Sequence, residues 1–384
     1  MKNITELIDG ILAYLVRCQE PVGEFAGSIW SELAYHNPLV DYRAGGSHHN
    51  RTVGGAGLAF TRLAATHPDS DLMHSAERAF DWVVTRQHED GGMFEITNGE
   101  APSQFHLPYE RSSISLGIVC HGLYGALLQG LPAKNEYREF LIAAARWQLT
   151  VETTPGNFLH TEGYPPEKLV LNASAHAAET LLVAGRLTTD PVEQSQFHAA
   201  AERAVKAILK SQRKNGMFPY SDIPDDNSIS YSATVCWALQ NLIDLALLPG
   251  RLLPRTHRAL AHGIRFLETC VNDDGSIGWE EWETHGQKYH TWVYGQMARV
   301  LTWSGSATGK DKAEALIAFM RRELYNPHTK LCRLYDFPVG QQRLVAGRSV
   351  LSEDLHECAY HQADLLECLI DVRSSQGAAV GGDT

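Results

Sequence analysis

One pattern recurs along the chain: an apolar helical run ends at a glutamine and is followed by a polar turn and Gly-x-aromatic. The fullest copy is Ala201–Phe218, in which the apolar run ends at Gln212. Two other copies keep every feature, and two drifted copies keep the turn glycine but replace the glutamine. The glutamine positions of these five copies are Gln19, Gln87, Glu152, Gln212 and Val271. Recurrence at intervals of roughly 60 residues predicts a repeat architecture.

A second helix is expected after each copy, where a polar loop leads into an apolar segment rich in small residues. A sixth, degenerate copy at Ala313–Leu331 keeps little beyond its apolar helix. The pattern therefore predicts six helical hairpins. Their second helices are expected at Val53–Ala65, Ser112–Leu128, Ala173–Leu187, Ile229–Leu248, Thr291–Trp303 and Ala359–Val372.

The composition permits one large domain. The chain has 384 residues, 44% of them hydrophobic and 20% charged, and no linker rich in proline or serine divides it. We expect a single domain over residues 1–374 and a disordered tail at residues 375–384. The seven cysteines occur singly in helical contexts without Cys-x-x-Cys spacing, which is typical of buried thiols in a reducing compartment.

Charge and hydropathy exclude several classes of partner. The net charge is −12 and no Lys/Arg cluster occurs, which argues against nucleic acid. No basic and then apolar leader begins the sequence, and no run approaches eighteen apolar residues. We therefore expect a cytoplasmic monomer or homodimer that does not bind membranes and needs no cofactor.

Polar side chains gather just before and within the first turns of the second helices. If these helices stand parallel in an inner ring, their N-terminal ends converge on one rim, where aligned N–H groups favour negative charge. We predict the functional site there. The residues expected to bind substrate are Asn50, Arg51, Glu110, Arg111, Asn172, Tyr289, Tyr294, His356 and Glu357.

Three glycines begin the first of these helices, at Gly54, Gly55 and Gly57. Each glycine costs a helix about 1 kcal/mol relative to alanine. Their presence indicates that something approaches the backbone closely. A ligand and a tightly packed neighbouring helix would both explain them.

The helix–Gln–turn–Gly-x-aromatic pattern resembles the QW repeat of terpenoid cyclases, and six such hairpins resemble the (α/α)6 toroid. Six-hairpin glycosidases, polysaccharide lyases and sugar epimerases share this all-α fold. The resemblance covers nearly the whole chain. In QW repeats the glutamine is a cap that joins an outer helix to an inner one, which implies scaffold roles for Gln19, Gln87 and Gln212.

The polar rim suits a small-molecule sugar or an oligosaccharide, and an acidic, uronate-type sugar in particular. A neutral His or a Tyr can remove a proton next to a carboxylate while Asn or Arg neutralises the acid group. The outcome is a lyase or an epimerase. Asn172 and His176, at i and i+4, resemble a pair found in some toroid lyases. The expected catalytic residues are His49, His176, Tyr231, His290 and His361.

Three alternatives remain open. A glycoside hydrolase needs carboxylates across the sugar, for which Glu110, Asp354 and Glu357 lie at the right helix ends. A terpenoid cyclase needs an Asp-x-Asp-Asp acid, and the nearest match, Asp222–Asp226, has a different spacing. A non-catalytic binding toroid would lack acids and bases that converge on one point.

Two short motifs resemble metal sites. Cys120-His121-Gly122 echoes the zinc-binding Cys-His-Gly of lanthionine cyclases, but its place in the chain differs. His356 and His361 are spaced at i and i+5 rather than at the i, i+4 spacing that grips zinc from one helix face. We therefore expect no metal.

Overall fold

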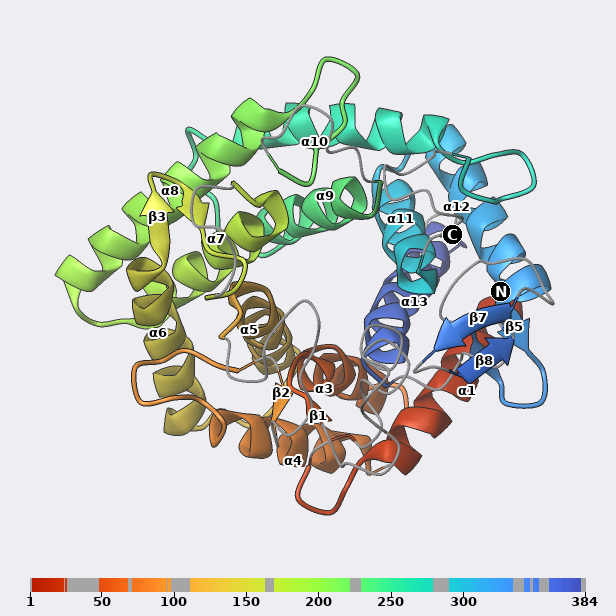
Figure 1. The fold of residues 1–384 in the computed structure, drawn as a ribbon, viewed down its shortest axis with the longest axis horizontal. Coiled ribbons are helices and arrows are strands. Elements are labelled where there is room, and N and C mark those ends of the chain that lie inside the picture. Colours follow the sequence, from red (N-terminus) through yellow and green to blue (C-terminus); the bar gives the residue numbers. More distant parts are fainter. Residues whose placement is uncertain are drawn as a thin grey trace.

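The protein forms two concentric rings of helices (Figure 1). The computed structural model describes residues 2–23, 25, 48–67, 71–94, 96–97, 111–162, 169–221, 229–278, 290–333, 342–345, 348–351 and 359–380. Within these residues, outer and inner helices alternate along the chain. This arrangement confirms the expected (α/α)6 toroid.

The outer ring surrounds the inner one on all sides (Figure 1). Its last helix continues into a π-helical turn, Met320–Leu324. The outer helices are α1 (Lys2–Cys18), α4 (Leu72–Val84), α6 (Asn135–Thr150), α8 (Pro191–Ser211), α10 (Leu253–Thr269) and α12 (Ala307–Phe319).

The inner ring closes on itself because its first helix packs against both its second and its last. The inner helices are α3 (Arg51–Ala64), α5 (Ser113–Leu128), α7 (Leu171–Leu187), α9 (Ile229–Asp244), α11 (Thr291–Trp303) and α13 (Ala359–Val380). All six second helices predicted from the repeat are confirmed. Three of them end elsewhere: α3 stops one residue early, α9 stops four residues early, and α13 runs into residues 375–380, where a disordered tail was expected.

The strands are short and antiparallel, and each sheet has two strands. Two pairs, β3–β4 and β5–β6, belong to repeat turns, whereas β1–β2 joins the loops that precede α3 and α5. The pairs are β1 (His48–His49) with β2 (Ile96–Thr97), β3 (Glu152–Thr154) with β4 (Asn157–Phe158), β5 (Tyr325–Asn326) with β6 (Leu331–Cys332), and β7 (Gln342–Val345) with β8 (Arg348–Leu351).

Burial follows the two-ring arrangement. In α5 every residue from Ser113 to Ala126 is buried, because the helix packs on α3, α6 and α7. An outer helix buries a single stripe, as expected for an amphipathic surface helix. In α10 that stripe consists of Thr256, Ala259, Leu260, Gly263, Ile264, Phe266 and Leu267. None of the described helices is both long and apolar enough to cross a membrane.

The repeat glutamines tie each outer helix to the next outer helix. The expectation that each glutamine joins an outer helix to an inner one is therefore wrong: the partner is the next outer helix. Each amide nitrogen donates to a main-chain carbonyl one helix further round the ring. The Nε2–O distances are 2.8 Å from Gln19 to Ser75, 3.0 Å from Gln87 to Phe140 and 2.8 Å from Gln212 to Ala259.

The two drifted copies also connect neighbouring outer helices, but through charged side chains instead of a glutamine. The carboxylate of Glu152 accepts from Nε of Arg203 in α8 at 2.8 Å and from the amide of Gly156 at 2.8 Å. At the next copy the ammonium of Lys312 in α12 donates to the carbonyl of Val271 at 2.8 Å. The repeat therefore conserves a contact between neighbouring outer helices rather than one residue type.

The turn glycines allow the same helices to approach closely. Gly216 has φ +98°, and a Cβ there would lie 2.4 Å from the carbonyl oxygen of His262 in α10. The turn glycines of the other four copies also have positive φ and face the next outer helix. At the sixth turn the roles are exchanged: Lys330 has φ +60°, and Gly10 of α1 supplies the space, because a Cβ on it would lie 2.2 Å from Lys330 O. This contact closes the outer ring.

The three glycines of α3 are explained by helix packing. A Cβ at any of them would meet an atom of a neighbouring helix. These nearest atoms are the Ile118 carbonyl oxygen at 2.5 Å for Gly54, the Ala363 main chain at 3.2 Å for Gly55 and the Phe80 ring at 2.6 Å for Gly57. Helix α3 therefore fits tightly among α4, α5 and α13, and its start is held in place.

Candidate active site at the starts of the inner helices

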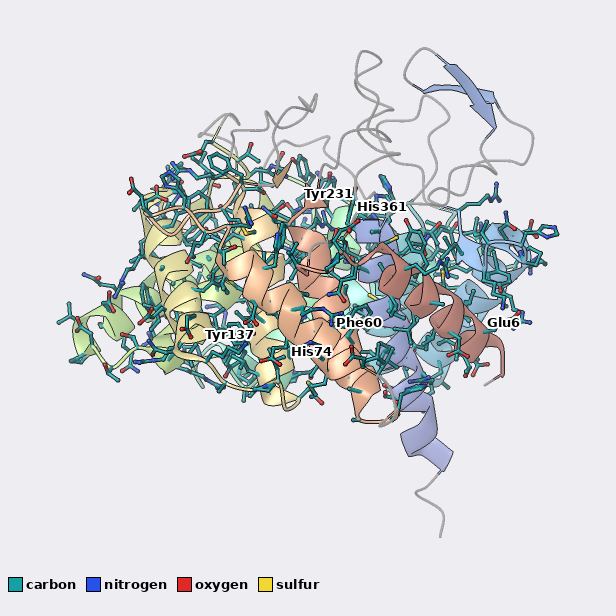
Figure 2. The ribbon with its side chains drawn as sticks, turned by 90° about the horizontal axis from the view of Figure 1, so that it is seen from below. Glu6, Phe60, His74, Tyr137, Tyr231 and His361 are labelled. Atoms are coloured by element: carbon teal, nitrogen blue, oxygen red, sulfur yellow. The ribbon has the colours of Figure 1, made fainter. Side chains whose placement is uncertain are left out.

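The starts of the inner helices lie at one edge of the toroid. Figure 2 shows Tyr231 and His361, from the first turns of α9 and α13, close to the same edge. Phe60, in the second half of α3, lies further from that edge. The convergence expected from the sequence is therefore present for these helices.

The first turns of α3 and α13 carry a connected polar group. Arg51 forms an ion pair with Asp364, and its guanidinium lies 4.8 Å from the ring centroid of Tyr360. The hydroxyl of Tyr360 lies 2.6 Å from Nε2 of His361. Burial raises the pKa of Asp364, although Arg51 opposes the shift. An arginine, a tyrosine, a histidine and an aspartate thus meet at one place.

His290 adds a second imidazole to this group. It is the N-cap residue of α11, and its ring centroid lies 4.9 Å from that of His361. The His290 ring also stacks on Trp292, with ring centroids 5.8 Å apart. Two of the histidines predicted to be catalytic are therefore in contact.

His176 comes from α7, which faces α13 across the inner ring (Figure 1). Its side chain is 1% exposed, and helix α5 makes room for it because a Cβ at Gly117 would lie 2.5 Å from the His176 Cβ. Burial, followed by the positive charges of His121 and Arg51, lowers the pKa of His176 to about 3. The imidazole is therefore neutral at pH 7 and can accept a proton.

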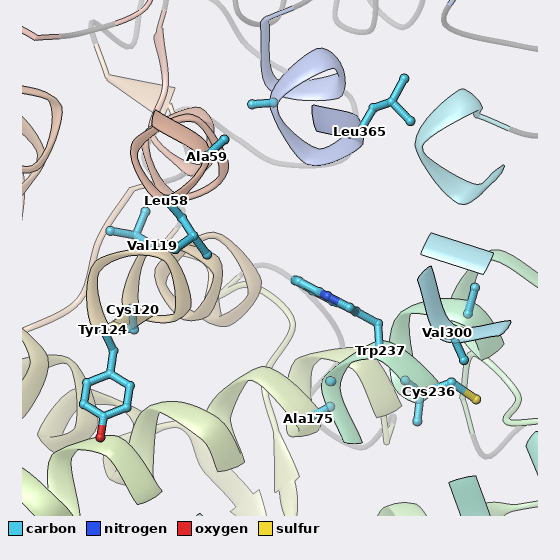
Figure 3. Packing of buried hydrophobic residues seen from close by; sticks show 14 of the residues in the cluster. Leu58, Ala59, Val119, Cys120, Tyr124, Ala175, Cys236, Trp237, Val300 and Leu365 are labelled. Atoms are coloured by element: carbon cyan, nitrogen blue, oxygen red, sulfur yellow. The ribbon is translucent and has the colours of Figure 1, made fainter. Parts of the chain in front are cut away.

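Trp237 of α9 lies beside this histidine, with ring centroids 5.7 Å apart. Figure 3 shows the Trp237 side chain directed toward the centre of the inner ring. Nδ1 of His176 and Nε1 of Trp237 are both buried and make no hydrogen bond to the described residues. Buried polar atoms in native proteins normally have partners, so these two atoms make this part of the inner ring a candidate place for a ligand.

A network of charged side chains lies one helical turn deeper. His121 contacts two carboxylates, with Nδ1 2.6 Å from Glu179 Oε1 and Nε2 3.1 Å from Glu367 Oε1. Arg299 donates to Glu367 at 3.1 Å and to the Asn241 side-chain oxygen at 2.9 Å. All five of these side chains are buried.

The network continues to the far end of the inner ring. Asp371 forms an ion pair with Arg299, with Oδ2 2.7 Å from Nε, and accepts a hydrogen bond from Nη1 of Arg62 at 2.9 Å. Sequence reasoning missed this group, because it considered His121 only as a metal ligand. A signal existed, since Glu179, Arg299 and Glu367 interrupt otherwise apolar helices.

The carboxylates hold His121 in its charged form. Burial alone would lower its pKa, but Glu179 and Glu367 outweigh burial and raise the pKa to about 10. Burial would likewise raise the pKa of Glu367, but His121 and Arg299 lower it to about 2. The site therefore rests on a layer of paired charges.

Other predicted residues lie around this group with different neighbours. The side-chain amide of Asn50 donates to the carbonyl of Phe94 at 2.7 Å and so fixes the entry to α3. The side-chain oxygen of Asn172 accepts from the amide of Ala173 at 3.1 Å. The ring of Tyr231 lies 4.1 Å from that of Tyr220.

Two predicted substrate-binding residues are engaged elsewhere in the fold. Arg111 forms ion pairs with Asp90 and Glu162. Tyr294 is fully buried and stacks on Phe319 of α12 with centroids 5.3 Å apart, so its side chain packs toward the outer ring. The structure does not bring Tyr294 to the group around His361. Helical periodicity explains the difference, because Tyr294 lies on the face of α11 that turns away from the centre.

The remaining candidates cannot be placed. The side chain of His49 lies outside the described residues, although its main chain is in β1. The residues that lie entirely outside the described ranges are Glu110, Tyr289, His356 and Glu357.

The thiol of Cys120 is buried, and burial raises its pKa, so it carries no thiolate at neutral pH. His121 beside it has both ring nitrogens on carboxylates. In the part of the chain that the structure describes, no group of three or more His, Cys, Asp and Glu side chains is arranged to hold a metal.

Solved structures similar to this one extend over nearly its whole length. Cellobiose 2-epimerase from Bacillus thermoamylovorans B4167 matches with a TM-score of 0.66 and 12% identity, covering 97% of this chain and 98% of that one. A D-mannose isomerase matches with a TM-score of 0.65 and 14% identity, covering 97% of each chain. An unsaturated glucuronyl hydrolase specific for heparin matches with a TM-score of 0.66 and 12% identity, covering 98% of each chain.

No protein-family model matches the chain. No curated protein matches it either. The similarity to solved structures agrees with the two rings of helices, the closed inner ring and the repeated turns described above. The protein therefore has the (α/α)6 toroid fold.

Proposed function

We propose that the protein is a sugar epimerase, which removes a proton from the carbon next to a carbonyl group and returns a proton to the opposite face. Inversion at such a carbon requires two acid–base groups on opposite sides of the substrate. His176 of α7 and His361 of α13 come from helices that face each other across the inner ring (Figure 1). This placement is the observation that carries the proposal.

The first step uses a neutral imidazole as the base. The C–H bond of an open-chain sugar breaks, its electron pair delocalises onto the carbonyl oxygen as an enolate, and the proton moves to His176. The low pKa of His176 keeps it unprotonated before this step. A proton from His361 then re-forms the C–H bond on the other face as the enolate collapses to the carbonyl. Afterwards His176 releases its proton to solvent and His361 takes one from solvent, which restores both groups.

The enolate oxygen needs positive charge or hydrogen-bond donors nearby. Arg51 can supply them, because its guanidinium lies next to Tyr360 and His361 and its charge acts on His176. Its ion pair with Asp364 holds the guanidinium in place. We assign Arg51 to the stabilisation of this oxygen.

Charge pairing favours an uncharged sugar over the uronate expected from the sequence. Arg51 and Arg111 were the cations expected to bind a substrate carboxylate. Each already forms an ion pair with a carboxylate of the protein. A substrate carboxylate at either arginine would have to compete with the protein carboxylate already paired there.

The same pairing favours proton transfer over hydrolysis. A glycosidase needs two carboxyl groups that face the scissile bond. The buried carboxylates described near the site, those of Glu179, Asp364 and Glu367, contact His121, Arg51 or Arg299 instead. These buried charges are also unlike the apolar chamber expected of a terpenoid cyclase. Among the similar structures, a cellobiose 2-epimerase and a D-mannose isomerase agree with this choice, whereas an unsaturated glucuronyl hydrolase does not, so the choice rests on the charge pairing.

The test is incubation of the protein in D2O with neutral aldoses and disaccharides and, separately, with uronate oligosaccharides, followed by NMR. We expect a neutral sugar to be converted to its epimer with one solvent deuterium at the carbon next to the carbonyl carbon. An unsaturated uronate product would instead identify a lyase. New reducing ends would identify a hydrolase, and either result would overturn the proposal.

A further inference from the structure

The buried charge network beneath the site supports an inference that rests on the proposed function. We propose that His121 is a positioning residue: an imidazolium clamped by Glu179 and Glu367 that keeps His176 neutral and correctly placed as the base. His121 itself does not touch the substrate in this scheme. It acts through the charge and the packing of the layer below.

The contacts of His121 require its charged form. A neutral imidazole has one N–H donor and one acceptor nitrogen, whereas the imidazolium has two donors. Both ring nitrogens of His121 face carboxylate oxygens, at 2.6 Å from Glu179 and 3.1 Å from Glu367. An ionised carboxylate only accepts hydrogen bonds. Two such partners are therefore satisfied together only by the imidazolium.

The charges of the network then balance. Three cations, on Arg62, His121 and Arg299, meet three anions, on Glu179, Glu367 and Asp371. Above them, Arg51 and Asp364 form a further balanced pair. Before substrate binds, a proton on His176 would add one uncompensated positive charge to a buried region, which is costly; during the proposed reaction the negative enolate balances that charge. The balance thus keeps His176 neutral.

Every inner helix contributes ionisable or polar groups to the charge network around the two histidines. These groups are Arg51 and Arg62 of α3, Cys120 of α5, Glu179 of α7, Asn241 of α9, Arg299 of α11, and Asp364, Glu367, Cys368 and Asp371 of α13.

Packing connects the charge to the base. The ring of Trp237 contacts His121 with centroids 5.1 Å apart and His176 with centroids 5.7 Å apart. Arg299 lies over the same indole at 5.5 Å. Glu179 also follows His176 by three residues on α7, so both lie on the same helix face. The contact between His121 and Glu179 therefore helps to hold the face of α7 that carries His176.

The directions of the pKa shifts agree with this arrangement. Burial followed by the charge of His121 lowers the pKa of His176, to about 3. Removal of the His121 charge should therefore raise it. Replacement of His121 and Glu179 together removes one charge of each sign and should leave it low.

The test is NMR titration of 13C-labelled histidine side chains, with His176→Gln used to assign one resonance. In the wild-type protein we expect His121 to stay protonated and His176 to stay neutral from pH 5 to pH 8. In His121→Gln we expect the midpoint of His176 to rise by roughly 1 to 3 units, the size of shift that one nearby charge produces. In His121→Gln/Glu179→Gln we expect it to return toward the wild-type value.

A His121 resonance that titrates near pH 6.5 in the wild-type protein would overturn the proposal without any variant. An unchanged His176 midpoint in His121→Gln would overturn it as well. The titration needs no substrate, so its result is separate from that of the sugar assay. Once a substrate is known, the acid limb of the kcat/KM profile should move to higher pH in His121→Gln, which a purely structural role would not cause.

Discussion

Nδ1 of His121 lies 2.6 Å from Oε1 of Glu179, with both side chains buried in the centre of the inner ring. The pair links α5 to α7, and Glu367 and Arg299 extend the link to α13 and α11. Charges at the centre of a helical ring are costly unless they are paired. These paired charges connect four of the six inner helices beneath the candidate site. They therefore hold in place the helices that carry the site residues.

This pair predicts a loss of stability at alkaline pH. The folded-state pKa of His121 is raised to about 10, so its contribution is complete below its unfolded value and is lost as pH rises toward 10. One proton changes the free energy of unfolding by up to ~1.4 kcal/mol per pH unit. Urea unfolding between pH 6.5 and pH 10 should show this slope in the wild-type protein. His121→Gln should lack it, and equal slopes in both proteins would contradict the assignment.

His176 predicts the opposite dependence at acid pH. Its folded-state pKa is lowered to about 3, so the unfolded chain binds a proton first as pH falls below about 6.5. Stability is therefore lost between about pH 6.5 and pH 3. His176→Gln should reduce this slope by the equivalent of one proton, whereas the exposed His257→Gln should leave it unchanged. Unfolding curves across this pH range measure the difference.

Three glycine substitutions can separate the cost of backbone strain at positive φ from the cost of a Cβ that meets a neighbouring helix. Gly216→Ala meets both a positive φ and the carbonyl of His262, Gly130→Ala meets only a positive φ of +102°, and Gly250→Ala meets neither. An alanine at positive φ costs about 1–2 kcal/mol. We expect the losses of unfolding free energy to rank Gly216 above Gly130 above Gly250. Equal losses at Gly216 and Gly130 would show that the approach of the outer helices does not matter.

The repeat glutamine can be tested in the same way. Gln212→Ala removes donors from the carbonyls of Gly216 and Ala259 and should cost about 1–3 kcal/mol of unfolding free energy. Gln129→Ala, on an exposed turn, is the matched control and should have little effect. Similar losses in the two variants would contradict the role of Gln212 as a tie between α8 and α10.

Much of the fold could be predicted from the sequence because the repeat carries it locally. Helix α11 was predicted at its observed bounds, since apolar small residues follow a polar loop. The partner of Gln19 could not be predicted, because the carbonyl of Ser75 carries no side-chain signal. The exchange of roles between Gly10 and Lys330 was missed for a similar reason: only ring closure brings the two residues together.

The candidate site was predicted in part. His176, His290 and His361 are ionisable residues near helix starts, and a toroid brings such positions to one rim. The depth of the site was not foreseen. Glu179 and Glu367 lie in the middle of helices, where sequence alone does not reveal which carboxylate pairs with which base across the ring. The predicted preference for an acidic sugar depended on Arg51 and Arg111, whose pairing with protein carboxylates only the structure reveals.

The most direct measurement is the exchange of solvent deuterium into each of the two epimers of the substrate, in His176→Gln and in His361→Gln. Each variant should lower epimerisation by about 10²- to 10⁴-fold, as expected for the loss of an acid–base group. Each should still exchange deuterium into one epimer, and the epimer should differ between the two variants. His257→Gln, on the outer helix α10, should behave as wild type. Exchange into both epimers at the wild-type rate in either variant would contradict the two-histidine mechanism.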